Sequence, residues 1–119
     1  MSVGKLCYRN PGEALLLLLL FFIEASTIQP LLHETTTEGE KLNLFCNSSG
    51  TPPPVVSWVR ISTGQRFDGH VLALTNINRG EAGDYRCEAS NDCGNDSKTT
   101  TIHVKCKYSF LLSCHSGLH

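Results

Sequence analysis

The sequence has no run of lysine or arginine, and its 10 basic and 11 acidic residues leave a formal net charge of -1. Nucleic-acid binders and helices that lie on membrane surfaces present a clustered basic footprint. Its absence excludes both classes. Helix-period segments are also lacking outside the N-terminal region. We therefore expect no nucleic-acid partner, and a fold built from strands.

The usual signatures of catalysis are missing as well. The sequence has no glycine-rich phosphate loop, no nucleophile elbow and no paired carboxylates in a cleft-forming context. A thiol nucleophile such as Cys93 with His103 would need a pocket that lowers the pKa of the thiol, and a solvent-facing turn supplies none. We therefore predict a non-catalytic protein without a cofactor.

A metal site is not expected either. The possible zinc ligands near the C-terminus are Cys106, Cys114, His115 and His119. Structural zinc sites usually bring two of their ligands as a close cysteine pair, and this segment has none. Residues 106–119 are interpreted as an irregular C-terminal tail.

Six cysteines in 119 residues are a high count, which indicates disulfides and an oxidising compartment. The N-terminus agrees with that setting. Residues 14–23 form a run of ten apolar residues, preceded by Lys5 and Arg9 and followed by small residues. A membrane span needs roughly 20 apolar residues. We predict a secretory signal peptide over residues 1–25, cleaved near Ala25, which would act as an anchor if cleavage failed.

Period-2 alternation of apolar and polar residues predicts strands along the rest of the chain. Turn-rich segments at 47–54 and 91–97, and a loop after residue 61, separate them. The expected strands are 26–38, frayed and suited by Pro30 only to an edge, then 39–46, 55–61, 70–77, 84–90 and 98–105. Short strands with turn signals about 8 to 12 residues apart describe an all-β sandwich or barrel.

Two cysteines are placed to join two sheets. Cys46 and Cys87 both face inward on well-separated predicted strands, so a disulfide could connect them across the core. Trp58 follows the first of them by 12 residues and would pack against this bridge. Tyr85 points to the same face as Cys87, one pleat nearer the turn, where Gly83 permits a sharp corner.

These residues resemble the immunoglobulin fold. The matching set, in order and spacing, is Cys46, Trp58, Leu74, Gly83, Tyr85 and Cys87. The segment GTPPPVVSW, residues 50–58, is similar to the loop before strand C in intermediate-set (I-set) and constant-2-like domains. Such domains occur in cell adhesion molecules, axon-guidance receptors and receptor tyrosine kinase ectodomains. Too few residues separate Trp58 from Ala73 for the extra strands of a variable-type domain.

The resemblance implies an all-β, immunoglobulin-like β-sandwich of two antiparallel sheets with Greek-key connections over residues 28–105. The residues it assigns are Cys46 and Cys87 for the disulfide, and Trp58, Leu74 and Tyr85 for the core. The tyrosine hydroxyl would donate a hydrogen bond to the backbone upstream, fixing the corner before the second cysteine.

The implied function is an extracellular recognition or cell-adhesion module, secreted or held at the cell surface. Its partners would be proteins, bound homophilically or heterophilically, and it would touch a membrane only through an uncleaved N-terminal segment or a longer parent chain. One alternative is a structural domain of an intracellular muscle-type scaffold, and another is a truncated receptor tyrosine kinase ectodomain. The N-terminal apolar run and the glycosylation acceptors favour the extracellular setting.

Two loops are candidate partner-binding surfaces, because exposed, structured loops often carry binding residues. They are the segment 48–54, with Pro53, and the turn 91–96, with Asp92 and Asn95. The predicted turns also hold glycosylation candidates. Asn47 and Asn95 each begin an Asn-x-Ser acceptor tripeptide.

Cys7 would leave with the signal peptide, and three further cysteines, Cys93, Cys106 and Cys114, have no assigned partner. About ten strand residues separate Cys93 from Cys106, a span of about 33 Å, whereas a disulfide holds its Cα atoms within roughly 7 Å. These two cannot pair within one flat hairpin. A bond between Cys106 and Cys114, or a bond to another chain, stays open.

Overall fold

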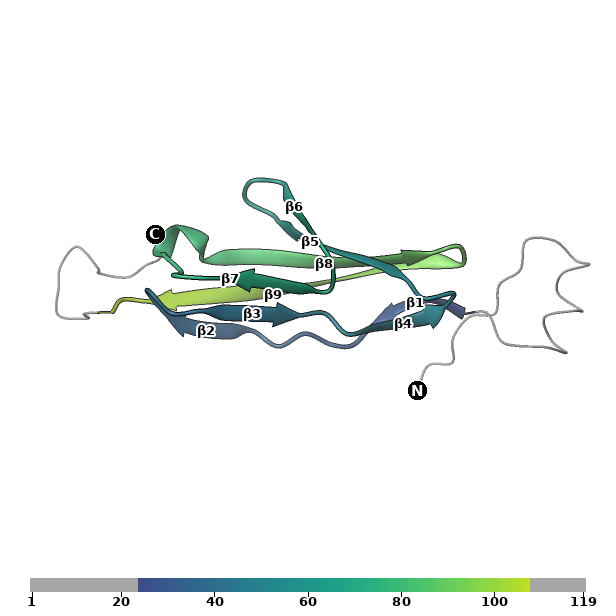
Figure 1. Cartoon of the computed structure of the whole chain (residues 1–119), viewed down its shortest axis with the longest axis horizontal. Coiled ribbons are helices and arrows are strands. Elements are labelled where there is room, and N and C mark those ends of the chain that lie inside the picture. Colours follow the sequence, from purple (N-terminus) through teal and green to yellow (C-terminus); the bar gives the residue numbers. More distant parts are fainter. Residues whose placement is uncertain (1–23, 108–119) are drawn as a thin grey trace, which may run out of the picture.

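The computed structural model describes residues 24–107, which Figure 1 shows as layered strands. The strands within this range are β1 (Glu24–Ile28), β2 (Glu34–Thr37), β3 (Leu42–Phe45), β4 (Ser48–Thr51), β5 (Val55–Arg60), β6 (Gln65–Asp68), β7 (Val71–Leu74), β8 (Gly83–Asn91) and β9 (Gly94–Lys105). A short 3-10 helix, η1 (Arg79–Glu81), precedes β8. The predicted all-β class is confirmed. None of the helical structure in this range is long and apolar enough to span a membrane.

One layer is a five-stranded sheet with the strand order β2-β9-β8-β5-β6. The hairpin of β8 and β9 runs the length of the domain in Figure 1. Neighbouring strands are antiparallel, except that β2 lies parallel to β9 at one edge. This parallel pair differs from the prediction, in which both sheets were antiparallel throughout. It arises because β2 reaches the sheet by crossing over from the other layer.

The predicted first strand, residues 26–38, is divided between the two layers. β1 pairs with β4, whereas β2 pairs with β9. Between them, Pro30 lacks the backbone N–H that a continuous ladder would need. β1 begins at Glu24, ahead of the predicted domain start at residue 28. Residues 1–23 and 108–119, with most of the predicted signal peptide and tail, lie outside the described residues.

The second layer consists of two antiparallel pairs, β3 with β7 and β1 with β4. Leu44 of β3 and Leu72 of β7 are buried in one cluster with residues of the five-stranded sheet. The disulfide between Cys46 and Cys87 crosses this cluster, with 6.4 Å between the two Cα atoms. The sandwich and its cross-core disulfide are thereby confirmed.

Two strands lie where turns or loops were predicted. β4 occupies part of the predicted turn 47–54, and β6 occupies part of the predicted loop after residue 61. Neither sequence, SSGT or QRFD, alternates apolar and polar residues. Each strand is instead held by pairing with a neighbour, β1 and β5 respectively. β9 also begins early, so the predicted turn 91–97 shrinks to Asp92 and Cys93.

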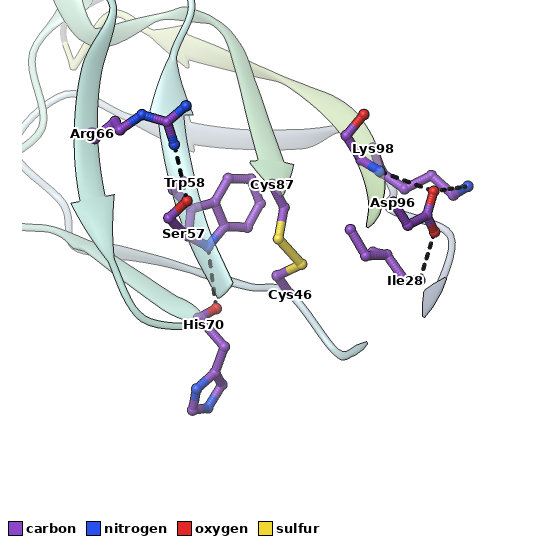
Figure 2. Close-up of a disulfide and its surroundings, with 10 residues drawn as sticks. Ile28, Cys46, Ser57, Trp58, Arg66, His70, Cys87, Asp96 and Lys98 are labelled. Carbon is purple, nitrogen blue, oxygen red and sulfur yellow. Dashed lines mark hydrogen bonds and ion pairs between the residues drawn. A yellow bond between two sulfur atoms is a disulfide. The ribbon is translucent and has the colours of Figure 1, made fainter. Parts of the chain in front are cut away.

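Trp58 and Tyr85 pack in the core around the disulfide. The indole is 1 % exposed, and its Nε1 donates to the backbone oxygen of His70 at 3.1 Å, beside the disulfide in Figure 2. The Tyr85 hydroxyl donates to the backbone oxygen of Glu81 at 2.7 Å, and burial raises the pKa of this phenol above its ordinary value. Leu74 is buried in the same cluster. These contacts fix β5 and β8, which carry the centre of the sheet's outer face.

Candidate protein-binding surface

The outer face of the five-stranded sheet carries apolar residues where a solvent-facing sheet is expected to be polar. Along β5, the side chains that alternate away from Trp58 are those of Val55, Ser57 and Val59, and Ile61 continues this column just after the strand. Val55 is 76 % exposed and Ile61 is 43 % exposed. These two exposed aliphatic side chains stand at the two ends of the column, with Ser57 and the buried Val59 between them.

The register of the strands arranges the outward side chains in four rows across the face, each named here by one member. The Val55 row holds Val55, Ser90 and Asn95; the Glu88 row holds Asp68, Ser57, Glu88 and Ser97; the Arg66 row holds Arg66, Val59, Arg86 and Thr99; the Ile61 row holds Ile61, Asp84 and Thr101. The acidic side chains of the Glu88 row therefore adjoin the basic side chains of the Arg66 row.

Glu88 lies at the centre of the face and joins two arginines. Its Oε1 is 2.8 Å from Nη1 of Arg66, and its Oε2 is 2.9 Å from Nε of Arg86. Arg66 also donates to the hydroxyl of Ser57 at 3.1 Å. The hydrogen bond from Arg66 is the main reason why the pKa of Glu88 is lowered. Desolvation opposes it, and the hydrogen bond from Arg86 makes a smaller contribution that lowers the pKa further. The network holds these charges in a defined arrangement.

We expect Arg66→Gln to raise the pKa of Glu88 toward the ordinary value of 4.5, because it removes the main hydrogen bond to the carboxylate. A lowered folded-state pKa contributes stability that is present above the unfolded pKa and is lost as the pH falls through the folded pKa. An NMR titration of the Glu88 carboxyl carbon in both proteins measures the shift. Lys98→Gln is the control, since Lys98 pairs with Asp96 at 3.7 Å instead. An unchanged Glu88 pKa in Arg66→Gln would contradict the network.

A hollow of about 590 Å³ lies on this face, toward the end where β8 turns into β9. Its lining includes the whole Val55 row together with Ser57, Arg66, Glu88 and Ser97. Aliphatic, hydroxyl, amide and charged groups therefore converge there. Such a mixture can cover an apolar side chain of a partner protein and satisfy polar groups around it.

The two loops predicted to bind partners meet at the same end of the domain. Nδ2 of Asn91 donates to the backbone oxygen of Pro52 at 2.9 Å, which ties the β8–β9 turn to the segment before β5. Pro53 and Asp92 are both exposed there. Asn95, expected in a turn, instead lies in β9 and belongs to the Val55 row. A binding role for these loop residues stays a prediction.

The outer face itself was not among the sequence predictions. Alternation predicts that Arg86 and Glu88 face away from the core, and their partial exposure in β8 agrees. The position of Arg66 could not be predicted, because β6 has no apolar alternation that would mark it as a strand. The pair of Arg86 and Glu88 can therefore be predicted from alternation, whereas the pair of Arg66 and Glu88 cannot.

The two glycosylation candidates are both exposed and lie on different layers. Asn47 stands between β3 and β4, in the second layer. Asn95 stands on the outer face of the five-stranded sheet. Their accessibility is compatible with glycosylation, which stays a prediction.

The described cysteines and acidic residues form no reactive or metal-binding cluster. Cys93 and Cys106 are both disulfide-bonded, so neither is a free thiol. Over residues 24–107, no three histidine, cysteine, aspartate or glutamate side chains gather as a metal site. Three of the zinc ligands considered above, at 114, 115 and 119, lie outside this range.

The sequence matches a family model described as immunoglobulin domain over residues 26–91. It is 32 % identical over 74 residues to human IgLON family member 5, a match that covers 62 % of this chain and 22 % of the relative. It is 37 % identical over 78 residues to human cell adhesion molecule 1, covering 61 % of this chain and 18 % of the relative. The chain thus spans about a fifth of the length of these relatives.

A solved structure resembles the fold closely. It is the complex of Dpr11 IG1 bound to DIP-gamma IG+IG2, and one of its chains aligns with a TM-score of 0.65 and 26 % sequence identity. The alignment covers 71 % of this chain and 49 % of that chain. The similar domain is therefore found in a protein–protein complex.

Proposed function

Because the chain belongs to the immunoglobulin domain family, we propose that it is an extracellular recognition and adhesion module that binds a second copy of itself through the outer face. One relative is named as a cell adhesion molecule, and the matched structure is a complex between proteins with immunoglobulin domains. The observation that carries the proposal is the self-complementary arrangement of the four rows. The role is binding, with no catalytic step.

The charged rows complement each other under a two-fold rotation. The axis lies parallel to the outer face and perpendicular to its strands, midway between the Glu88 row and the Arg66 row. A rotation of the second copy by 180° about this axis places each strand opposite the same strand of the first copy. Asp68 then faces Arg66 of the second copy, and Glu88 faces Arg86 of the second copy. Every such contact occurs twice in an isologous interface. Opposite charges brought together in this way fix the register of docking.

The same axis brings exposed apolar residues together. Val55 and Ile61 lie on the same column, three residues before and after Trp58. Rotation about the axis therefore places Val55 of one copy opposite Ile61 of the other. Removing these two exposed aliphatic side chains from water favours association, while the charged rows determine orientation.

Val55→Arg is expected to weaken self-association by at least about tenfold, because it places a charge against the apolar Ile61 of the second copy. The measurement is sedimentation equilibrium of the full chain, secreted from eukaryotic cells and freed of N-linked glycans. Phe45→Arg is the matched control, since Phe45 is 56 % exposed on β3 in the other layer. Loss of association in Phe45→Arg alone would move the interface to the other layer, and a wild type that stays monomeric would overturn the proposed partner.

Secretion of the chain from eukaryotic cells also tests the extracellular setting. We expect a product in the medium whose intact mass lacks residues 1–25 and changes on reduction as disulfides open. Retention of the chain in the cytosol with reduced cysteines would overturn this part of the proposal. That result would favour the intracellular scaffold alternative instead.

A further inference from the structure

Asn95 stands on the outer face together with the serine that completes its acceptor tripeptide. Asn95 and Ser97 alternate to the same side of β9, and both are exposed. Asp96 between them turns the other way. Its Oδ2 accepts a hydrogen bond from the backbone N of Ile28 at 2.7 Å, as Figure 2 shows. Because this contact fixes the side chain of Asp96 toward β1, the side chain of the neighbouring Asn95 points outward from the outer face into solvent.

Asn95 also lies in the same row as the exposed Val55. Ser90 of β8 stands between them in the register. Adjacent strands lie about 4.8 Å apart, so two strand spacings, about 10 Å, separate Asn95 from Val55. Both residues line the hollow of about 590 Å³. A bulky group on Asn95 would therefore cover the surface around Val55.

We propose that Asn95 carries an N-linked glycan, and that this glycan covers the Val55 row and closes the outer face to a second copy. In the attachment, Nδ2 of Asn95 bonds to C1 of a sugar donated by a lipid diphosphate-linked oligosaccharide. The C1–O bond to the diphosphate breaks, the diphosphate leaves with that electron pair, and the amide proton is released. The masking of self-association rests on the function proposed above. Occupancy of one asparagine then sets whether the module can pair.

Asn47 gives an internal comparison. It carries the same kind of acceptor tripeptide and is equally exposed, but it lies between β3 and β4 in the second layer. A glycan at Asn47 would project from the layer opposite to Val55. Its presence or absence should leave the outer face accessible, which separates an effect of position from a general effect of sugar.

The first experiment measures occupancy and masking without any partner. Asn47 alternates to the same side as Phe45, so a glycan there would also shield position 45. Val55→Cys and, as control, Phe45→Cys are therefore made together with Asn47→Gln and secreted from eukaryotic cells, and peptide masses give the occupancy of Asn95. A bulky maleimide is expected to label the cysteine at 55 at least about tenfold faster after N-glycans are removed, and the cysteine at 45 at an unchanged rate. An unoccupied Asn95, or equal labelling at position 55 before and after deglycosylation, would overturn the inference.

The second experiment measures pairing. Glycosylated wild type is expected to stay monomeric in sedimentation equilibrium, whereas Asn95→Gln and Ser97→Ala, which both remove the acceptor, self-associate. Asn47→Gln should remain monomeric like the wild type. Equal association of the glycosylated wild type and Asn95→Gln would overturn the masking. The two experiments can also give different answers. If the glycan slows labelling of the cysteine at position 55 but the protein stays monomeric after deglycosylation, then the inferred glycan at Asn95 is supported and only the proposed self-association is wrong.

Discussion

Replacement of Cys46 by alanine is expected to lower the free energy of unfolding by on the order of 4 kcal/mol. The disulfide joins residues 41 positions apart, and in the chain-entropy model a loop of this length restricts the unfolded state by about that amount. Domains of this size are stable by about 5 to 15 kcal/mol. The loss is therefore a large share of the margin, and we expect Cys46→Ala to be substantially unfolded at body temperature.

Urea denaturation and thermal melting, each followed by circular dichroism, measure this loss. Thr99→Ala is a suitable control, because Thr99 is exposed on β9 and its replacement should stay within about 0.5 kcal/mol of the wild type. Cys87→Ala should behave like Cys46→Ala, since either change removes the same bond. A cysteine variant that melts within a degree or two of the wild type would show that the sandwich does not depend on the cross-core link.

Trp58→Ala is the second change with a large expected effect, about 3 to 5 kcal/mol of destabilisation. The indole is 1 % exposed, packs in the core cluster with the disulfide and donates to the backbone oxygen of His70. Alanine would leave a cavity in the core and an acceptor without its donor. Because β5 carries this residue, the column from Val55 to Ile61 on its opposite side should lose order as well.

Trp58→Phe provides the comparison for this variant. Phenylalanine keeps much of the apolar volume and loses the hydrogen bond to His70, so its cost should be clearly smaller than that of alanine. Trp58 is the only tryptophan in the chain, so circular dichroism rather than tryptophan fluorescence must follow unfolding. Equal stability of Trp58→Ala and wild type would contradict the packing described for the core.

The sequence predicted those strands whose two faces differ strongly in polarity. β7 and β8 are such cases, because alternate side chains enter the core and mark the period directly. β4 and β6 were missed because pairing with a neighbour, rather than a buried face, makes them strands. The split of the first strand into β1 and β2 likewise depends on two different neighbours, which no local pattern contains.

The candidate surface was less predictable than the core. Tyr85 and Cys87 belong to a short motif, so their roles follow from local spacing. The ion network instead joins Arg66 to Glu88, on strands far apart in the sequence, and it exists only once the register is fixed. Asn95 shows the same limit, since its membership in a row with Val55 depends on how three strands align.

The parallel edge of the sheet has a mechanical consequence. The chain enters β2 at Glu34 and leaves β9 at Lys105, and these strands lie side by side in the same direction. Tension applied on both sides of the domain would therefore pull the two strands past each other along their length. Their ladder would be loaded in shear, so that its hydrogen bonds must break together instead of unzipping in sequence.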